Sequence, residues 1–215
     1  MRARRPIAVG AALWLAARAA AAGDQAPGRL ELGASVGVAA PLGGTERGER
    51  LRDTTFGAVP FALDAAYRIA TRAGIAAHLH YGVVVPTLCP TASDCASSLG
   101  ADVSAVVGAR VHLPGRGPLA PIADVGVGYE WLTTRMSDAG AHSTRAHQGP
   151  VLVRLGLAAP FRFAGRWSFG PAADVSLGTF TAYALETNAD SPAGRVPARA
   201  LHAWVSVGAR LAHDF

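Results

Sequence analysis

Acidic, basic and histidine side chains recur throughout this 215-residue sequence in segments where they alternate with apolar residues. On the polar side of that alternation we count seven acids, five arginines and four histidines. Such near-balance favours ion pairing, because buried charges are tolerated when they are paired and hydrogen-bonded. We predict an interior ion-pair network that includes Asp64, Arg68, His78, His80, Arg110, Asp124, Arg154, Asp174 and Arg210.

Two short connections allow particular pairs to be predicted. If the segments before and after residues 70–74 pair as a hairpin, Asp64 lies near His80 and Arg68 near His78. Across residues 114–118, Arg110 lies diagonal to Asp124. A polar channel that conducts ions is the alternative interpretation of the same side chains.

Three histidines on the same face, His78, His80 and His112, raise the possibility of a metal site, since neutral imidazole is a good ligand. Antiparallel pairing through the long connection between them separates His112 from His80 by several residues. Histidines bonded to carboxylates are the simpler interpretation, and we predict no metal and no cofactor.

Hydrolytic chemistry would require a serine, a histidine and an acid close together. The pair His142–Ser143 lies in a polar connection without an adjacent acid on a strand, and the apolar faces carry no serine. We also find no phosphate loop, dinucleotide fingerprint or paired-carboxylate arrangement. The sequence therefore predicts no catalytic residues and a protein that is not an enzyme.

The two cysteines, Cys89 and Cys95, lie six residues apart in a segment rich in proline and serine. In an exported protein an even pair of this kind is most simply a local disulfide. Free thiols and a metal site remain alternatives, the latter with only Asp94 as a further ligand nearby.

The N-terminus has the features of an export signal. Arg2, Arg4 and Arg5 precede an apolar stretch and the small residues Ala20–Ala22, so we predict a cleaved signal peptide over residues 1–22. A short lead follows at 23–29. Four of the 20 basic residues lie in the signal, which leaves 16 − 15 = +1 for the mature chain. That balance gives no indication of nucleic-acid binding.

The remainder, residues 30–215, is predicted to be one β-barrel domain. Alternation with period two identifies a strand in each of eight segments. They are 30–40, 61–70, 75–85, 101–113, 119–131, 151–163, 167–180 and 201–215. On one face of each strand the residues are apolar, and almost all the charges fall on the opposite face.

Connection lengths decide whether the apolar face looks inward or outward. Residues 70–74, 114–118 and 164–166 form short connections, whereas 41–60, 86–100, 132–150 and 181–199 are long. This alternation is typical of membrane barrels, which have tight periplasmic turns and long external loops. A soluble lipocalin-like barrel is the alternative. We predict an all-β fold, an eight-stranded antiparallel up-and-down transmembrane β-barrel with its apolar side chains outward.

The last strand carries the most specific feature. Val207, Ala209, Leu211 and Phe215 share one parity, and the chain ends on the aromatic residue. With this pattern the chain resembles small outer-membrane barrels of the OmpA/OmpX type. The resemblance implies that these four residues form the signal read by the barrel-assembly machinery. His213 departs from it, because the family usually has an apolar or aromatic residue there.

From this resemblance we expect a monomeric integral protein of a Gram-negative outer membrane. Its partners would be outer-membrane lipid, the assembly machinery during biogenesis and, through Arg47, Arg50 and Arg52, the phosphates of lipopolysaccharide. Its role would be structural or surface recognition by the external loops, because function usually resides in loops on a rigid scaffold. A narrow, porin-like pore for small solutes or ions is the alternative function.

Overall fold

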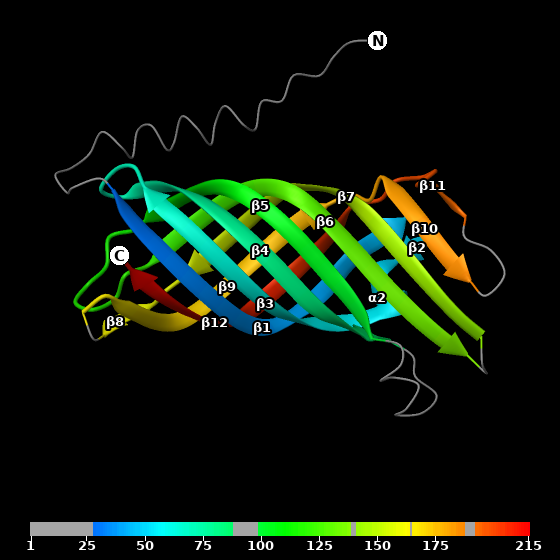
Figure 1. Cartoon of the computed structure of the whole chain (residues 1–215), viewed down its shortest axis with the longest axis horizontal. Helices are drawn as coiled ribbons and strands as arrows, with labels where there is room; N and C mark the ends of the chain where they lie inside the picture. The colour runs from blue at the N-terminus through cyan, green and yellow to red at the C-terminus, as the bar shows by residue number, and fades with distance from the viewer. Residues whose placement is uncertain (1–27, 88–98, 139–140, 164, 188–191) are drawn as a thin grey trace, which may run out of the picture.

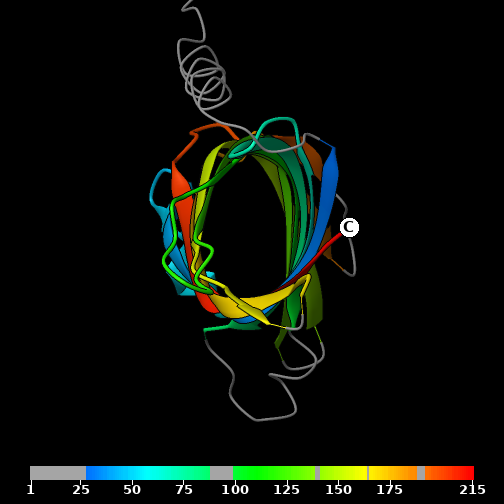
Figure 2. The same ribbon diagram turned by 90° about the vertical axis from the view of Figure 1, so that its left-hand side faces the viewer.

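Eight long strands form the wall of a closed barrel (Figures 1 and 2). The structure is a computed structural model that describes residues 28–87, 99–138, 141–163, 165–187 and 192–215. The wall strands are β1 (Arg29–Glu46), β3 (Thr55–Arg68), β4 (Ala73–Pro86), β5 (Gly100–His112), β6 (Ile122–Asp138), β7 (Ala141–Ala158), β9 (Trp167–Gly178) and β12 (His202–Asp214). Neighbours along the chain pair antiparallel, and β1 closes the barrel by pairing with β12. The predicted eight-stranded architecture is confirmed.

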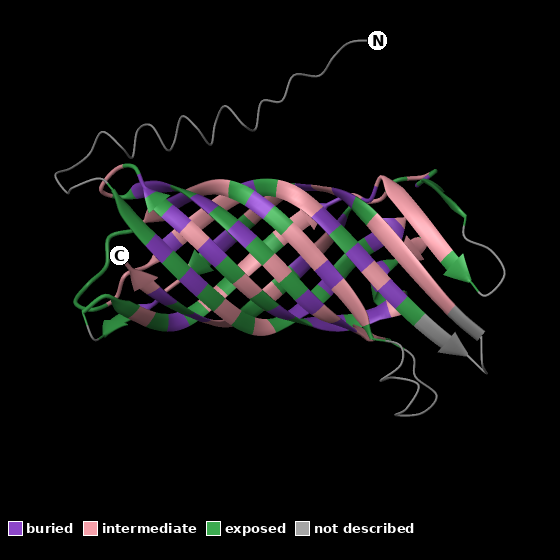
Figure 3. Ribbon diagram, in the orientation of Figure 1, coloured by how far each residue is buried: buried purple, intermediate pink, exposed green. Residues whose placement is uncertain are grey.

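The apolar faces of the strands look outward. Val38, Leu63, Ile75 and Leu157 are each more than 60% exposed, because nothing in the protein covers them. Most charged residues on the opposite face are buried or partly buried, with Arg110 only 1% exposed. Figure 3 shows the resulting alternation of exposed and buried residues around the wall. This outward orientation distinguishes a membrane-type barrel from a soluble one.

Strand β7 departs from the predicted alternation. Val151 was predicted to face outward, but it is 2% exposed, and Leu152 is exposed instead. The register against β9 shifts between Val151 and Val153, which indicates a β-bulge. A bulge sets two residues opposite one and so reverses the facing of the residues before it. Leu155 and Leu157, beyond the bulge, face outward as predicted.

At one end of the barrel the connections are short, as predicted. Ile69 and Ala70 close the β3–β4 turn by donating to the carbonyl of Ala73. The β7–β9 connection includes the short strand β8 (Phe161–Phe163), which pairs with β9. Both termini of the barrel also lie at this end (Figure 1). We refer to it as the short-turn end.

At the opposite, long-connection end, several predicted loops contain secondary structure. The segment 132–150, expected to be a loop, is instead a hairpin in which β6 and β7 continue to pair. Further elements are β2 (Glu49–Arg50), α2 (Leu51–Thr54), β10 (Ala182–Thr187) and β11 (Ala193–Arg195). Among the described residues no helix is both long and apolar enough to cross a membrane.

An apolar cluster closes the interior at the long-connection end, and we call it the apolar plug. Leu51, from α2, and Phe180, which follows β9, are fully buried in it. Its remaining members are Ala39, Ala58, Val84, Leu132, Val196 and Trp204. Removing this apolar surface from water stabilises the closed end, by about 1.5–3 kcal/mol for one large side chain.

The predicted signal peptide and the cysteines Cys89 and Cys95 lie outside the described residues.

Candidate functional site

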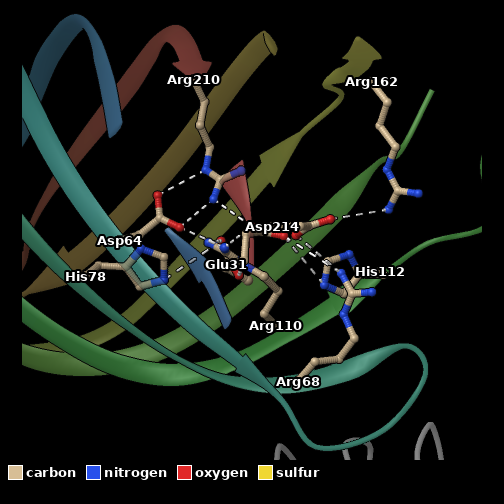
Figure 4. Close-up of polar contacts among 10 residues, drawn as sticks. Glu31, Asp64, Arg68, His78, Arg110, His112, Arg162, Arg210 and Asp214 are labelled. Carbon is tan, nitrogen blue, oxygen red and sulfur yellow. Dashed lines mark hydrogen bonds and ion pairs between the residues drawn. The ribbon is translucent and has the colours of Figure 1, made fainter. Parts of the chain in front are cut away.

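The interior side chains at the short-turn end form what we call the inner ion-pair cluster (Figure 4). They come from β1, β3, β4, β5, β6, β8 and β12. All project from the inward face of a wall strand except Arg162, which lies in β8 and is half exposed. Its members are Glu31, Asp64, Arg68, His78, Arg110, His112, Asp124, Arg162, Arg210 and Asp214. Four carboxylates and four guanidinium groups balance one another in it.

Arg110 lies at the centre of the cluster and contacts three carboxylates. Its Nη1 atom is 2.5 Å from Glu31 Oε1 and 2.7 Å from Asp64 Oδ1. On the other edge of the guanidinium, Nε and Nη2 donate to the two oxygens of Asp124 at 2.8 and 3.0 Å. This fork-to-fork geometry is the strongest form of side-chain hydrogen bonding.

Arg210 completes the same arrangement from β12. Its Nη2 atom donates to Glu31 at 2.7 Å and to Asp64 at 2.5 Å, and its Nε donates to Asp64 at 3.0 Å. Gly33 provides the space for this pair, because a Cβ atom there would overlap both side chains. Glu31 and Asp64 therefore each bridge two arginines.

A looser set of contacts surrounds this centre. Arg68 Nη2 lies 3.9 Å from Asp214 and 4.0 Å from Glu31, and Arg162 lies 4.0 Å from Asp214. His112 Nε2 is 4.0 Å from Glu31. These distances are too long for hydrogen bonds, so this shell contributes charge balance rather than fixed geometry.

The hairpin of β3 and β4 has a different register from the predicted one. Asp64 lies opposite His78, whereas His80 had been expected, and Arg68 lies opposite Gly74. The partner of Asp64 is thus two residues, and that of Arg68 four residues, earlier than predicted, because the turn is centred nearer the N-terminus than assumed. Arg110 and Asp124 lie directly opposite each other, closer than the diagonal placement predicted from the sequence.

Midway along the barrel a smaller polar group lies around Asp174. Arg154 Nε is 3.3 Å from Asp174 Oδ1, and the Ser206 hydroxyl donates to Oδ2 of the same carboxylate. Next to this group lies a cavity whose volume, measured for the centres of water-sized spheres, is about 50 Å³. Its lining combines apolar residues with serine hydroxyls and charged side chains.

Between this cavity and the apolar plug lies a second buried group, which the site prediction did not include. Glu130 Oε2 is 2.8 Å from His202 Nε2, and Glu130 Oε1 accepts a hydrogen bond from Trp204 Nε1 at 2.9 Å. The His202 ring stacks on Phe180 with centroids 4.0 Å apart. Strand parity had placed Glu130 and His202 inside, but no sequence signal indicated that they meet.

The three histidines considered as metal ligands contact three different carboxylates. His78 lies 3.8 Å from Asp124, His80 lies 3.3 Å from Asp102, and His112 lies near Glu31. Within the described ranges, no three His, Cys, Asp or Glu side chains converge on a point where a metal ion could be held. The two residues considered for hydrolysis, His142 and Ser143, belong to β7, which extends beyond the barrel wall.

The four residues of the predicted assembly signal lie on the last strand and at its end. Val207, Leu211 and Phe215 are 40–56% exposed on the outer surface, while Ala209 is partly covered. His213, which departs from the family pattern, packs edge-on between Trp167 and Phe215, with ring centroids 4.7 and 4.5 Å apart. Its imidazole thus makes aromatic contacts where the family usually has an apolar or aromatic residue.

Comparisons with known proteins establish the class of fold. No family model matches the sequence, and no curated protein matches it significantly. Among solved structures, outer membrane protein OprG from Pseudomonas aeruginosa superimposes with a TM-score of 0.57 at 10% identity, over 88% of this chain and 96% of that one. A major outer membrane protein from Thermus thermophilus superimposes with a TM-score of 0.53 at 12% identity, over 88% of this chain and 100% of that one. The chain has the fold of the small outer-membrane β-barrels.

Replacing Arg110 by glutamine tests how far the inner ion-pair cluster stabilises the barrel. Glu31, Asp64 and Asp124 would each lose a charged partner while remaining buried, so we expect a loss of about 3–5 kcal/mol in the free energy of unfolding. The measurement is urea-induced unfolding of the detergent-folded protein. Arg116→Gln, in an exposed turn, is the matched control and should change stability by less than about 0.5 kcal/mol. Equal effects of the two substitutions would contradict the assignment.

Proposed function

We propose that this protein resides in a bacterial outer membrane and has a structural or surface-recognition role, exerted through its long-connection end. The outward band of apolar side chains around the whole wall supports the location, because only lipid or detergent could cover it. The fold shared with OprG of P. aeruginosa supports it too. A cleaved signal peptide over residues 1–22 would deliver the chain, and the barrel-assembly machinery would insert it as a monomer.

The observation that carries the proposed role is the filling of the interior at two levels. The inner ion-pair cluster spans the short-turn end, and the apolar plug occupies the long-connection end. Between them the described residues form the Arg154–Asp174 and Glu130–His202 pairs beside a cavity of about 50 Å³. An eight-stranded barrel is just wide enough for side chains to fill it. This arrangement favours a scaffold for external segments over a conduit, and we assign no catalytic role.

Lipopolysaccharide is the proposed partner at the long-connection end. Arg47, Arg50 and Arg52 are exposed there, beside or within β2 and α2. Arg199 is brought close to them, since Arg47 N donates to the carbonyl of Ala198. Arginine binds phosphate bidentately, so this group suits the phosphates of lipid A and the inner core. In this orientation the short turns face the periplasm, and the predicted Cys89–Cys95 disulfide belongs to a connection on the external side.

Cell fractionation combined with heat-modifiable gel migration tests the proposed location. We expect the protein in the outer-membrane fraction, migrating faster before boiling than after it, because a folded barrel resists detergent until it is heated. Recovery in the periplasmic or cytoplasmic fraction, with no change of migration on boiling, would exclude the proposal.

Planar-bilayer recording separates the scaffold from the alternative, a narrow pore. We expect no stepwise conductance from the purified protein, because the Arg110 and Arg210 side chains and their carboxylate partners occupy the interior at the short-turn end. A porin prepared in the same detergent is the positive control. Reproducible steps that persist after the long connections are trimmed would establish the pore instead.

Neutralising three arginines together tests the lipid partner. In the variant Arg47→Gln/Arg50→Gln/Arg52→Gln we expect several-fold less lipopolysaccharide to copurify with the folded barrel, since each lost bidentate contact weakens phosphate binding. The control is Arg72→Gln/Arg116→Gln/Arg166→Gln at the short-turn end, which should retain wild-type amounts. An equal loss in both triple variants would show that net charge, rather than this site, holds the lipid.

A further inference from the structure

We propose that the short-turn end is a docking surface for anionic phospholipid, held by a ring of exposed arginines that we call the basic collar. The collar consists of Arg29, Arg72, Arg116 and Arg166. The proposal rests on the membrane location proposed above and goes beyond it, because it assigns a lipid partner to the end of the barrel opposite the proposed lipopolysaccharide site.

The four arginines are spread around the rim of the barrel. Arg29 begins β1, and Arg116 lies in the connection between β5 and β6. Arg72 precedes β4, and its carbonyl accepts a hydrogen bond from the end of β5. Arg166 precedes β9, and its carbonyl accepts a hydrogen bond from the end of β12. Because these strands lie at different points of the closed sheet, the positive charge surrounds the short-turn end (Figure 1).

Acidic side chains do not neutralise the collar. Within the described residues none of its arginines belongs to an ion pair, and the carboxylates of the inner ion-pair cluster are balanced by arginines of that cluster. The exposed acids among the described side chains, Asp53 and Glu186, lie at the opposite end. Even with the terminal carboxylate of Phe215 counted, the rim has an excess of 4 − 1 = 3 positive charges.

The collar begins where the outward apolar band ends. Each of its arginines lies within three residues of an outward apolar side chain that is 39–47% exposed. These side chains are Leu30, Ile69, Leu113 and Trp167. A long basic side chain at such a position lays its stem along the apolar surface and extends its charge into the head-group layer. The position therefore favours the phosphates of membrane lipid over a soluble polyanion.

Anionic phospholipid has the complementary chemistry. Its phosphate can accept two parallel hydrogen bonds from one guanidinium group. In addition, each basic residue near an anionic membrane surface is attracted to it, by an amount that corresponds to a roughly fivefold rise in association. A zwitterionic lipid carries the same phosphate without net charge. We therefore expect the collar to prefer phosphatidylglycerol over phosphatidylcholine.

Fluorescence quenching of Trp167, the neighbour of Arg166, measures this preference. The variant Trp131→Phe is folded into vesicles that contain both lipids, with one or the other brominated on its acyl chains. Trp131 is the exposed tryptophan of the opposite end and Trp204 is buried, so quenching by bromine reports mainly on Trp167. We expect phosphatidylglycerol to associate next to Trp167 roughly fivefold more strongly than phosphatidylcholine.

The variant Arg72→Gln/Arg116→Gln/Arg166→Gln removes three charges of the collar and leaves the inner ion-pair cluster intact. We expect the two lipids to associate almost equally with it, whereas it should copurify with as much lipopolysaccharide as the wild-type protein. The triple variant of the long-connection end described above is the matched control, and it should keep the preference for phosphatidylglycerol. If the collar variant does not fold, Arg166→Gln alone, beside the reporting tryptophan, replaces it.

The ionic strength provides a second readout. The preference of the Trp131→Phe protein should weaken as salt is added, because the Debye length falls from about 30 Å at 0.01 M to about 3 Å at 1 M. A preference that depended on acyl-chain packing would not respond in this way.

Two results would overturn the proposal. One is equal association of the two lipids next to Trp167 while the collar is intact, and the other is an undiminished preference in the collar variant. If the barrel shows no lipid preference but sediments with peptidoglycan through the same arginines, the collar binds a cell-wall polymer and the lipid assignment is wrong. All these measurements use a barrel already folded into vesicles, so they leave the outer-membrane location to the fractionation experiment.

Discussion

The structure depends on one electrostatic constraint: a charge on the inward face of this barrel must find its counter-charge inside the same narrow space. The outward faces are apolar around the whole wall, so a charged side chain of the inward face has no polar surroundings outside the barrel. Because an unpaired buried charge is costly, the strands must close in a register that brings acids and arginines together. Arg110 shows the result, with three carboxylates around one guanidinium group.

Two different kinds of interaction fill the barrel along its axis. At the short-turn end the filling is ionic and geometrically specific, whereas at the other end Leu51 and Phe180 provide non-directional apolar packing. His202 connects the polar and apolar parts of the interior, because its ring stacks on Phe180 of the apolar plug while its Nε2 atom contacts Glu130. The small cavity lies between them.

The facing of most strand residues follows from the local alternation of side chains, whereas the strand register and the bulge depend on how the strands pair in the closed barrel. Strand parity placed Asp64, Arg110 and Arg210 inside, because side chains alternate with period two. It misplaced Val151, since a one-residue bulge leaves no mark in an apolar run. It also placed Asp64 near His80, whereas Asp64 lies opposite His78, because the centre of a short turn fixes the register and the sequence did not determine that centre.

The sequence by itself determined the strand alternation, the contrast of short and long connections, and most of the charged side chains that face inward. Only the tertiary structure decided which of them meet. Arg210 and Glu31 are 179 residues apart and become neighbours because β12 closes against β1. The fully buried Leu51 belongs to a segment that had been expected to be an external loop. Such contacts depend on how the sheet closes on itself, and that global geometry is not encoded in any local pattern of residues.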